Sequence, residues 1–224
     1  MYLINRKKKF SFLQNPRFLR WVTGTIFLLI RMSLIKNYFM PLSIAKSIHQ
    51  HFLKHPFFKT SIDKYLKWIP YAVVPFLDIF GFRTRSGWKK QLLIAGITDA
   101  TRYLIVDNLK KLTKEHRPAP FLGNHSFPSG HTSSSFAGAE FMHQELKNSL
   151  PIVSCAGYVA ATATGTIRLM KNRHWLKDVV CGAAIGIFSA KLVYYLVSKT
   201  RNRKKEIHHI DPNSTEKKSQ LKNV

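Results

Sequence analysis

The chain has 224 residues, with 36 Lys and Arg against 11 Asp and Glu, and a formal net charge of +25. That length suits one compact domain, and the excess of positive charge favours an anionic partner: nucleic acid, an acidic membrane surface or a phosphorylated substrate. A hydrophobic content of 45% excludes a disordered basic chain, and two cysteines are too few for a disulfide scaffold or a Cys-based zinc cluster. Cys155 and Cys181 each lie in an apolar run, so we expect both to be buried.

Apolar segments occur along most of the chain, and each approaches the length of about 20 residues that a membrane-spanning helix needs. In chain order they are 18–34, 67–82, 91–107, 131–146, 151–170 and 178–198. The segment 131–146 is the weakest, because Glu140, His143 and Glu145 are costly in hydrocarbon and have to face protein or an interface. The segment 18–34 follows a basic cluster, as in a signal peptide, but no small-x-small cleavage site follows it. We therefore expect an uncleaved first span, with a cleaved signal as the alternative.

The distribution of Lys and Arg indicates how these segments cross a membrane. Basic clusters occur at 6–9, 83–90 and 199–205, and an even number of spans with both ends in the cytoplasm places all three on the same side. The basic stretch 35–66 then falls on the other side, which counts against this topology. We predict an all-α, polytopic membrane bundle of about six transmembrane helices. A soluble all-helical protein with apolar core helices and a basic surface is the alternative.

The remaining segments complete the expected domain organisation. Residues 1–17 are expected to form a basic cytoplasmic lead, 18–198 a membrane-embedded domain, and 199–224 a disordered polar tail. Residues 35–66 have the composition of an interfacial amphipathic helix, and residues 108–130 that of a long polar connection.

The last apolar segment carries a pattern of small residues. Gly182 and Gly186 have the small-xxx-small spacing that lets two membrane helices approach closely. Packing in a soluble bundle would give the same pattern. The spacing therefore predicts a close contact between two helices, and it does not distinguish a membrane bundle from a soluble one.

A first polar cluster lies at the start of the connection. Lys110 and Arg117 are seven residues apart, about two turns of helix, so both can project from one helix face. Two cations on one face suit the binding of an anion. In a basic protein, however, such a pair more often belongs to a solvated helix face.

A second cluster, Pro128-Ser129-Gly130-His131, lies at the start of the next predicted helix. Ser129 is a good N-cap, and the free backbone N–H groups of a helix start, together with the helix dipole, favour an anion there. Gly130 lets the anion approach the backbone, and His131 is then held beside it. Ordinary capping is the alternative interpretation.

A third cluster consists of Arg168, His174 and Asp178. His174 and Asp178 are four residues apart, one helical turn, so their side chains are expected to meet. A carboxylate on one imidazole nitrogen fixes the tautomer and leaves the other nitrogen free to attack. Arg168 adds a guanidinium that can bind phosphate through two N–H groups. A structural hydrogen bond between His174 and Asp178 is the alternative.

In this order and at these spacings, the three clusters resemble the three-part signature of the type 2 phosphatidic acid phosphatase superfamily. The signature positions here are Lys110, Arg117 and Pro118, then Pro128, Ser129, Gly130 and His131, then Arg168, His174 and Asp178. The resemblance covers about residues 68–198. Ile167 departs from it, because the family usually has Ser before the arginine of the third part.

The resemblance implies a role for each signature side chain. His174 would be the nucleophile that forms a phosphohistidine, Asp178 its orienting partner, and His131 the general acid and later the base. The groups that would bind the substrate phosphate are Lys110, Arg117, Ser129, Gly130 and Arg168. The family uses no metal and no other cofactor, and its catalytic core is a bundle of four helices.

The implied function is that of a membrane hydrolase, a metal-independent lipid phosphatase. Its substrate would be a phosphomonoester or pyrophosphate of a lipid, for which polyprenyl pyrophosphate, phosphatidylglycerophosphate, phosphatidic acid and lipid A are candidates. The expected partners are the membrane and this lipid, not nucleic acid, and the oligomeric state stays open. The expected location is the bacterial inner (plasma) membrane, with the site on the periplasmic face. Alternatives are a soluble periplasmic acid phosphatase of the same superfamily and a non-catalytic basic protein that binds membranes or nucleic acid.

Overall fold

The computed structural model describes residues 61–118 and 123–210, with side chains up to residue 200. These ranges form helices and no strand, so the all-α prediction is confirmed for them. The helices are α3 (Ile62–Leu66), α4 (Ile69–Ile79), α5 (Trp88–Thr113), α6 (Gly130–Leu146), α7 (Pro151–Met170) and α8 (Leu176–Ile210).

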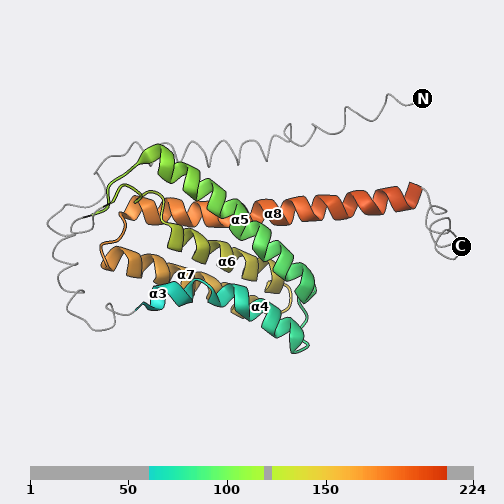
Figure 1. Ribbon diagram of the computed structural model, residues 1–224. Coiled ribbons are helices and arrows are strands. Elements are labelled where there is room, and N and C mark those ends of the chain that lie inside the picture. Colours follow the sequence, from blue (N-terminus) through green and yellow to red (C-terminus); the bar gives the residue numbers. More distant parts are fainter. Residues whose placement is uncertain (1–60, 119–122, 211–224) are drawn as a thin grey trace, which may run out of the picture.

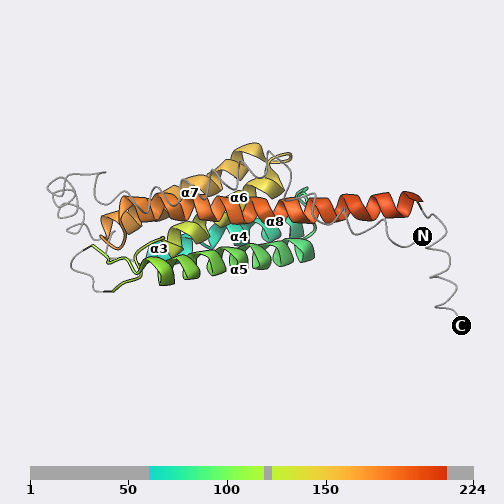
Figure 2. The same ribbon diagram turned by 90° about the horizontal axis from the view of Figure 1, so that it is seen from above.

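Helix α6 is the centre of the bundle. Helices α7 and α8 pack along it, and α4 and α5 contact its remaining sides (Figures 1 and 2). Most of its residues are buried, including the small residues Ser134, Ala137, Gly138 and Ala139. Small side chains let neighbouring helices approach closely. Helix α6 is therefore surrounded by other helices, although its own hydrophobicity is low.

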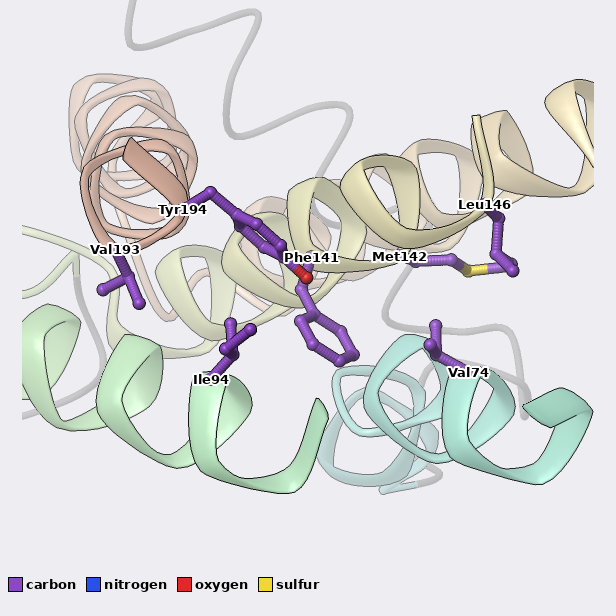
Figure 3. Close-up of a cluster of buried hydrophobic side chains, with 7 residues drawn as sticks. All are labelled: Val74, Ile94, Phe141, Met142, Leu146, Val193 and Tyr194. Atoms are coloured by element: carbon purple, nitrogen blue, oxygen red, sulfur yellow. The ribbon is translucent and has the colours of Figure 1, made fainter. Parts of the chain in front are cut away.

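A hydrophobic cluster joins four of the helices, far from the C-terminal ends of α5 and α7. Figure 3 shows Phe141 of α6 between Tyr194 of α8, Ile94 of α5 and Val74 of α4. The Phe141 ring lies 6.3 Å from that of Tyr194, measured between ring centroids. Full burial of such side chains contributes about 1.5–3 kcal/mol each, and it fixes α4, α5 and α8 around α6.

The contact between α6 and α8 depends on the two glycines of the small-residue pattern. A Cβ atom at Gly182 would lie 2.7 Å from the Ser129 carbonyl oxygen, and one at Gly186 would lie 2.3 Å from that of Ser133. Both distances are shorter than any that a Cβ atom adopts, so only glycine permits this approach of the two backbones. The predicted close helix contact is confirmed, and α6 is the partner helix.

The charged residues of α6 have polar partners inside the bundle. The Tyr194 hydroxyl donates to Glu145 Oε1 at 2.6 Å, and the Ser86 backbone N–H donates to Oε2 at 2.8 Å. Glu140 accepts from the Tyr158 hydroxyl of α7. Carboxyl groups with such partners are tolerated away from water, which explains why the weakest apolar segment still forms a central helix.

Several element boundaries differ from the prediction. The segment 67–82 gives α4, a helix of 11 residues, because Gly81 adopts a φ of 85° and the chain turns there. Helix α5 extends through Thr113, so the polar connection is shorter than 108–130. Helix α8 continues to Ile210 rather than ending near 198. Lys, Arg and Glu are good helix formers, and cations near a helix C-terminus are favoured.

One helix in the described ranges, Leu176–Thr200, is long and apolar enough to cross a membrane, at 25 residues. A helix of that length is about 37 Å long, against a hydrocarbon thickness of about 30 Å. The predicted lead 1–17, the predicted span 18–34 and most of 35–66 lie outside the described residues, as does the end of the tail. The number of six spans therefore stays a prediction. Cys181 is buried as expected, whereas Cys155 is exposed on α7.

Candidate active site

The three sequence clusters meet at one end of the bundle. Helix α5 ends there, α6 begins, α7 ends and α8 begins, all toward the left of Figure 1. Because α5 and α7 run opposite to α6 and α8, the residues at these four ends are adjacent in space although far apart in sequence. The described connecting residues 114–118, 123–129 and 171–175 lie at the same end.

His174 and Asp178 form the most buried part of this end. The two residues have relative exposures of 4% and 0%. His174 Nδ1 lies 3.4 Å from Asp178 Oδ2. This separation is longer than that of a well-formed hydrogen bond. Helix α8 begins only at Leu176, so His174 lies in the turn before it and not one helical turn away on the same helix. The predicted pairing is present nevertheless.

Two further donors hold the Asp178 carboxylate. The Ser126 hydroxyl donates to Asp178 Oδ2 at 2.5 Å, and the Trp175 backbone N–H donates to the same oxygen at 3.0 Å. Ser126 is fully buried. Ser126 was not among the predicted site residues, and the only local signal was its position three residues before the N-cap Ser129.

Ser129 joins the second cluster to the third. Its backbone N–H donates to the Asp178 carbonyl at 3.0 Å, so the start of α6 is fixed to the first turn of α8. Its side chain caps α6 as predicted, accepting from Thr132 N at 3.4 Å. The first N–H groups of α6 have no partner within the helix and, with the helix dipole, attract an anion. Gly130 and the half-buried His131 follow directly.

The first cluster is arranged differently from the prediction. Lys110 lies on the last turn of α5, and Lys114 ends the helix in the left-handed conformation with φ 45°. Arg117 therefore lies in the connection and not on the helix face of Lys110. Hydrogen bonds within the connection fix its position, from Arg117 N to the Gly123 carbonyl at 3.2 Å and from Ser126 N to the Glu115 carbonyl at 2.9 Å.

Burial and neighbouring charges alter the basicity of Lys110, which lies beyond the predicted span 91–107. Its Nζ donates to the His125 carbonyl at 2.6 Å. Burial, and then the positive charge of Arg117, lower the pKa of Lys110 to about 8. The charge of Arg117 therefore acts on Lys110, even though the two residues do not share a helix.

His174 titrates below the usual range of a histidine. Burial lowers its pKa, and the Asp178 carboxylate offsets only part of this effect. The neutral imidazole, which has a free nitrogen lone pair, therefore predominates at neutral pH. This is the protonation state that a nucleophilic histidine needs.

Arg168 lies on the last turn of α7 and is buried, with a relative exposure of 8%. Its Nη1 donates to Asp63 Oδ2 at 2.7 Å, and Lys171 Nζ donates to Asp63 Oδ1 at 2.6 Å. Asp63 is on α3 and comes from the basic stretch 35–66, in which the sequence analysis singled out no functional residue. Ile167, beside Arg168, is buried as well.

Other polar residues of this end contribute their backbones. His116 and His125 are both exposed, and it is their carbonyl oxygens that accept from Trp175 Nε1 and Lys110 Nζ. His143 is on a different part of α6, where Nδ1 lies 3.2 Å from the Ser154 hydroxyl.

Among the described residues, no group of three or more His, Cys, Asp or Glu side chains could hold a metal ion.

Curated relatives of this chain carry lipid phosphatase names. A lipid A 1-phosphatase of Porphyromonas gingivalis is 37% identical over 140 residues, which is 62% of this chain and 31% of the relative. A probable lipid phosphate phosphatase 4 of Arabidopsis thaliana is 34% identical over 105 residues, 42% of this chain and 32% of the relative. The chain thus spans about a third of the length of these two relatives.

Solved structures share the fold. The crystal structure of Aquifex aeolicus LpxE matches with a TM-score of 0.54 and 20% identity, covering 72% of this chain and 98% of that one. A transmembrane PAP2 type phosphatidylglycerolphosphate phosphatase from Bacillus subtilis matches with a TM-score of 0.58 and 18% identity, covering 79% and 96%. A sequence model of the PAP2 superfamily matches residues 91–202, half of the chain, and includes all three clusters. This chain therefore belongs to the PAP2 superfamily.

Proposed function

We propose that this protein is a membrane phosphatase that removes phosphate from a phosphorylated lipid through a phosphohistidine on His174. One observation carries the proposal: a buried His174 lies beside Asp178, and Asp178 is fixed to the start of a helix through the Ser129 N–H bond to its carbonyl. A nucleophile and an anion-binding helix start are thereby held side by side.

The first chemical step transfers the phosphoryl group to the enzyme. His174 Nε2 attacks phosphorus and forms a P–N bond, while the P–O bond to the lipid or to its remaining phosphate breaks. The leaving oxygen takes a proton from His131. Asp178 Oδ2, which lies 3.4 Å from Nδ1 in the structure, accepts from Nδ1–H as the reaction proceeds. This bond keeps the proton off Nε2 and stabilises the positive charge that develops on the ring.

The second step returns the enzyme to its starting state. Water gives a proton to His131 and attacks phosphorus, the P–N bond breaks, and inorganic phosphate leaves. His131 therefore serves as acid in one step and as base in the other. Removing such a group costs about 10²–10⁴-fold in rate.

Charge stabilisation is the other requirement of phosphoryl transfer. We assign it to the cations at this end of the bundle, Lys110, Arg117 and Arg168, and to the N–H groups of Gly130 and His131 at the start of α6. Ser129 Oγ already caps α6 and lies 2.9 Å from Thr132 Oγ1, so its contribution to phosphate binding is through helix-start geometry. This set of donors supplies positive charge without a metal ion.

The membrane location is supported by the outer surfaces of the bundle. Large apolar side chains are exposed on α4, α5 and α7, among them Phe76, Leu93, Leu104, Ile152 and Val159. In soluble monomers, large exposed apolar patches usually mark surfaces that bind a protein or a membrane. Together with the candidate span in α8, these surfaces suit lipid contact.

Among the candidate substrates we place the lipid A type first, because the similar P. gingivalis protein is named a lipid A 1-phosphatase. Phosphatidylglycerophosphate, phosphatidic acid and polyprenyl pyrophosphate are the other candidates.

We further propose that the site faces the periplasm from the inner membrane. The basic segments 83–90 and 199–205 lie at the opposite end of the bundle from the site, and basic segments suit the cytoplasmic side.

Phosphate release from these four lipids in detergent, with EDTA present, tests the proposal. We expect release from at least one lipid by the wild type, and release at the level of the enzyme-free control by His174→Ala. His143→Ala is the matched control, because that histidine lies away from the site and bonds Ser154. Equal release by wild type and His174→Ala would overturn the assignment of the nucleophile, and loss of activity in EDTA would overturn the metal-independent mechanism. Activity in protein purified without detergent would favour a soluble acid phosphatase.

A further inference from the structure

A carboxylate from outside the family signature is built into the phosphate-binding end. Asp63 lies on α3, before residues 91–202 that match the family model and before the region 68–198 that resembles the signature. Its relative exposure is 1%, although it is a charged residue on a five-residue helix. Burial at this level requires partners for both carboxylate oxygens.

The partners of Asp63 are both cations at the end of α7. Oδ2 accepts from Arg168 Nη1 at 2.7 Å, and Oδ1 accepts from Lys171 Nζ at 2.6 Å. Burial raises the pKa of Asp63, but the bonds from Lys171 and Arg168 outweigh it, so the pKa lies below the usual range. Asp63 is thus an anion at neutral pH, and it is bound through a different oxygen to each cation.

The geometry leaves a defined part of Arg168 for a ligand. A guanidinium recognises phosphate through two adjacent N–H groups. Asp63 bonds Nη1, while Nε is buried and has no hydrogen-bond partner among the described residues. A buried N–H without a partner is costly, and a phosphate oxygen would satisfy it. The Nε side of Arg168 is therefore the side available to substrate.

We propose that Asp63 is a positioning residue, which holds the Arg168 guanidinium by Nη1 and presents its Nε side to the substrate phosphate. This inference rests on the proposed function, because it takes Arg168 as a phosphate ligand. It adds α3 to the parts of the chain that build the site.

Two roles for Asp63 predict opposite effects on anion binding. If Asp63 were only a counter-ion, its removal would leave the site more positive, and anions would bind more tightly. If Asp63 positions Arg168, its removal lets a long side chain adopt other rotamers, and anions bind more weakly. The sign of the change in affinity therefore decides between them.

Orthovanadate is a suitable probe, because it resembles phosphate and its binding to the purified full chain in detergent does not require turnover. We expect Asp63→Ala to raise the Kd for orthovanadate by about tenfold, which corresponds to about one charge-assisted hydrogen bond. Asp63→Asn keeps an acceptor without the charge, so its Kd should lie between those of wild type and Asp63→Ala. Lys64→Ala, an exposed neighbour on α3, should leave the Kd unchanged.

The Arg168→Ala background separates positioning from a general loss of structure. In that background the Kd for orthovanadate is already raised, and Asp63→Ala should leave it unchanged or lower it, because no guanidinium remains to be positioned. A lower or unchanged Kd in Asp63→Ala alone would overturn the proposal, as would an equal rise in Kd in both backgrounds. If Asp63→Ala does not fold, the same comparison is made with Asp63→Asn. Vanadate binding with these signs but no release of phosphate from any lipid would refute the lipid substrate and leave the role of Asp63 intact.

Discussion

Replacing Gly186 with alanine tests whether the close approach of α6 and α8 holds the bundle together. The added Cβ atom would lie 2.3 Å from the Ser133 carbonyl oxygen and 2.8 Å from Ala137 N, both atoms of the α6 backbone. Backbone atoms cannot rotate away as a side chain can, so the two helices have to separate. Overpacking of a core costs about 1–3 kcal/mol, and we expect a value near 3 kcal/mol here.

Gly96→Ala provides the matched control. Gly96 is in the interior of α5, and a Cβ atom there would meet no atom within 4 Å. Alanine is about 1 kcal/mol more favourable than glycine inside a helix, so this variant should be more stable than the wild type. The same substitution is thus expected to have opposite signs at the two positions.

Thermal unfolding in detergent measures the difference. For a chain of this size, 1 kcal/mol corresponds to about 2–4 °C in Tm, so we expect Gly186→Ala to lower Tm by about 6–12 °C and Gly96→Ala to raise it by about 2–4 °C. Equal Tm values for the two variants, or a Gly186→Ala protein as stable as the wild type, would refute the contact between α6 and α8 as described.

Three further predictions concern the site. Because the pKa of Lys110 is lowered to about 8, its positive charge is present below that pH and lost above it. We therefore expect kcat/KM to fall above about pH 8, and we expect Lys110→Arg to move this fall to higher pH. An unchanged pH profile in Lys110→Arg would contradict the assignment of Lys110. Burial lowers the pKa of His174, so the neutral nucleophile persists in acid, and the acid limb of kcat/KM should lie below pH 6.5. Ser126→Ala removes a hydrogen bond to the Asp178 carboxylate worth about 1.5–3 kcal/mol, so kcat should fall about 10–100-fold. Ser189 is a buried serine whose hydroxyl donates to the Ile185 carbonyl in α8, so Ser189→Ala should keep wild-type kcat. Equal effects of the two substitutions would show a loss of packing instead.

Much of the fold could be predicted from local pattern. The expected segment 151–170 is helix α7, which runs from Pro151 to Met170, and its boundaries follow from a proline at the start and the change to polar residues after the end. The glycine spacing in 178–198 predicted a close contact that the structure confirms. Both features depend on residues that are close together in the sequence, so a local pattern is enough to predict them.

The parts that sequence reasoning missed depend on contacts between distant residues. Lys114 ends α5 with a positive φ, which is rare outside glycine, so the departure of Arg117 from the helix had no clear local signal. Asp63 is 105 residues from Arg168 and looks like any charged residue of a basic stretch until α3 packs against α7. Ser126 is 52 residues from Asp178, and only the folded connection brings the two together.

The most direct test of the central claim is to find the phosphate on the enzyme during turnover. Wild-type protein is mixed with its preferred lipid phosphate in detergent, quenched in alkali, which preserves phosphohistidine, and digested for mass spectrometry. We predict a phosphoryl group on His174 in the wild type and none in Asp178→Ala protein, whose imidazole has lost its orienting carboxylate. Phosphate release that proceeds with another residue phosphorylated would contradict the account.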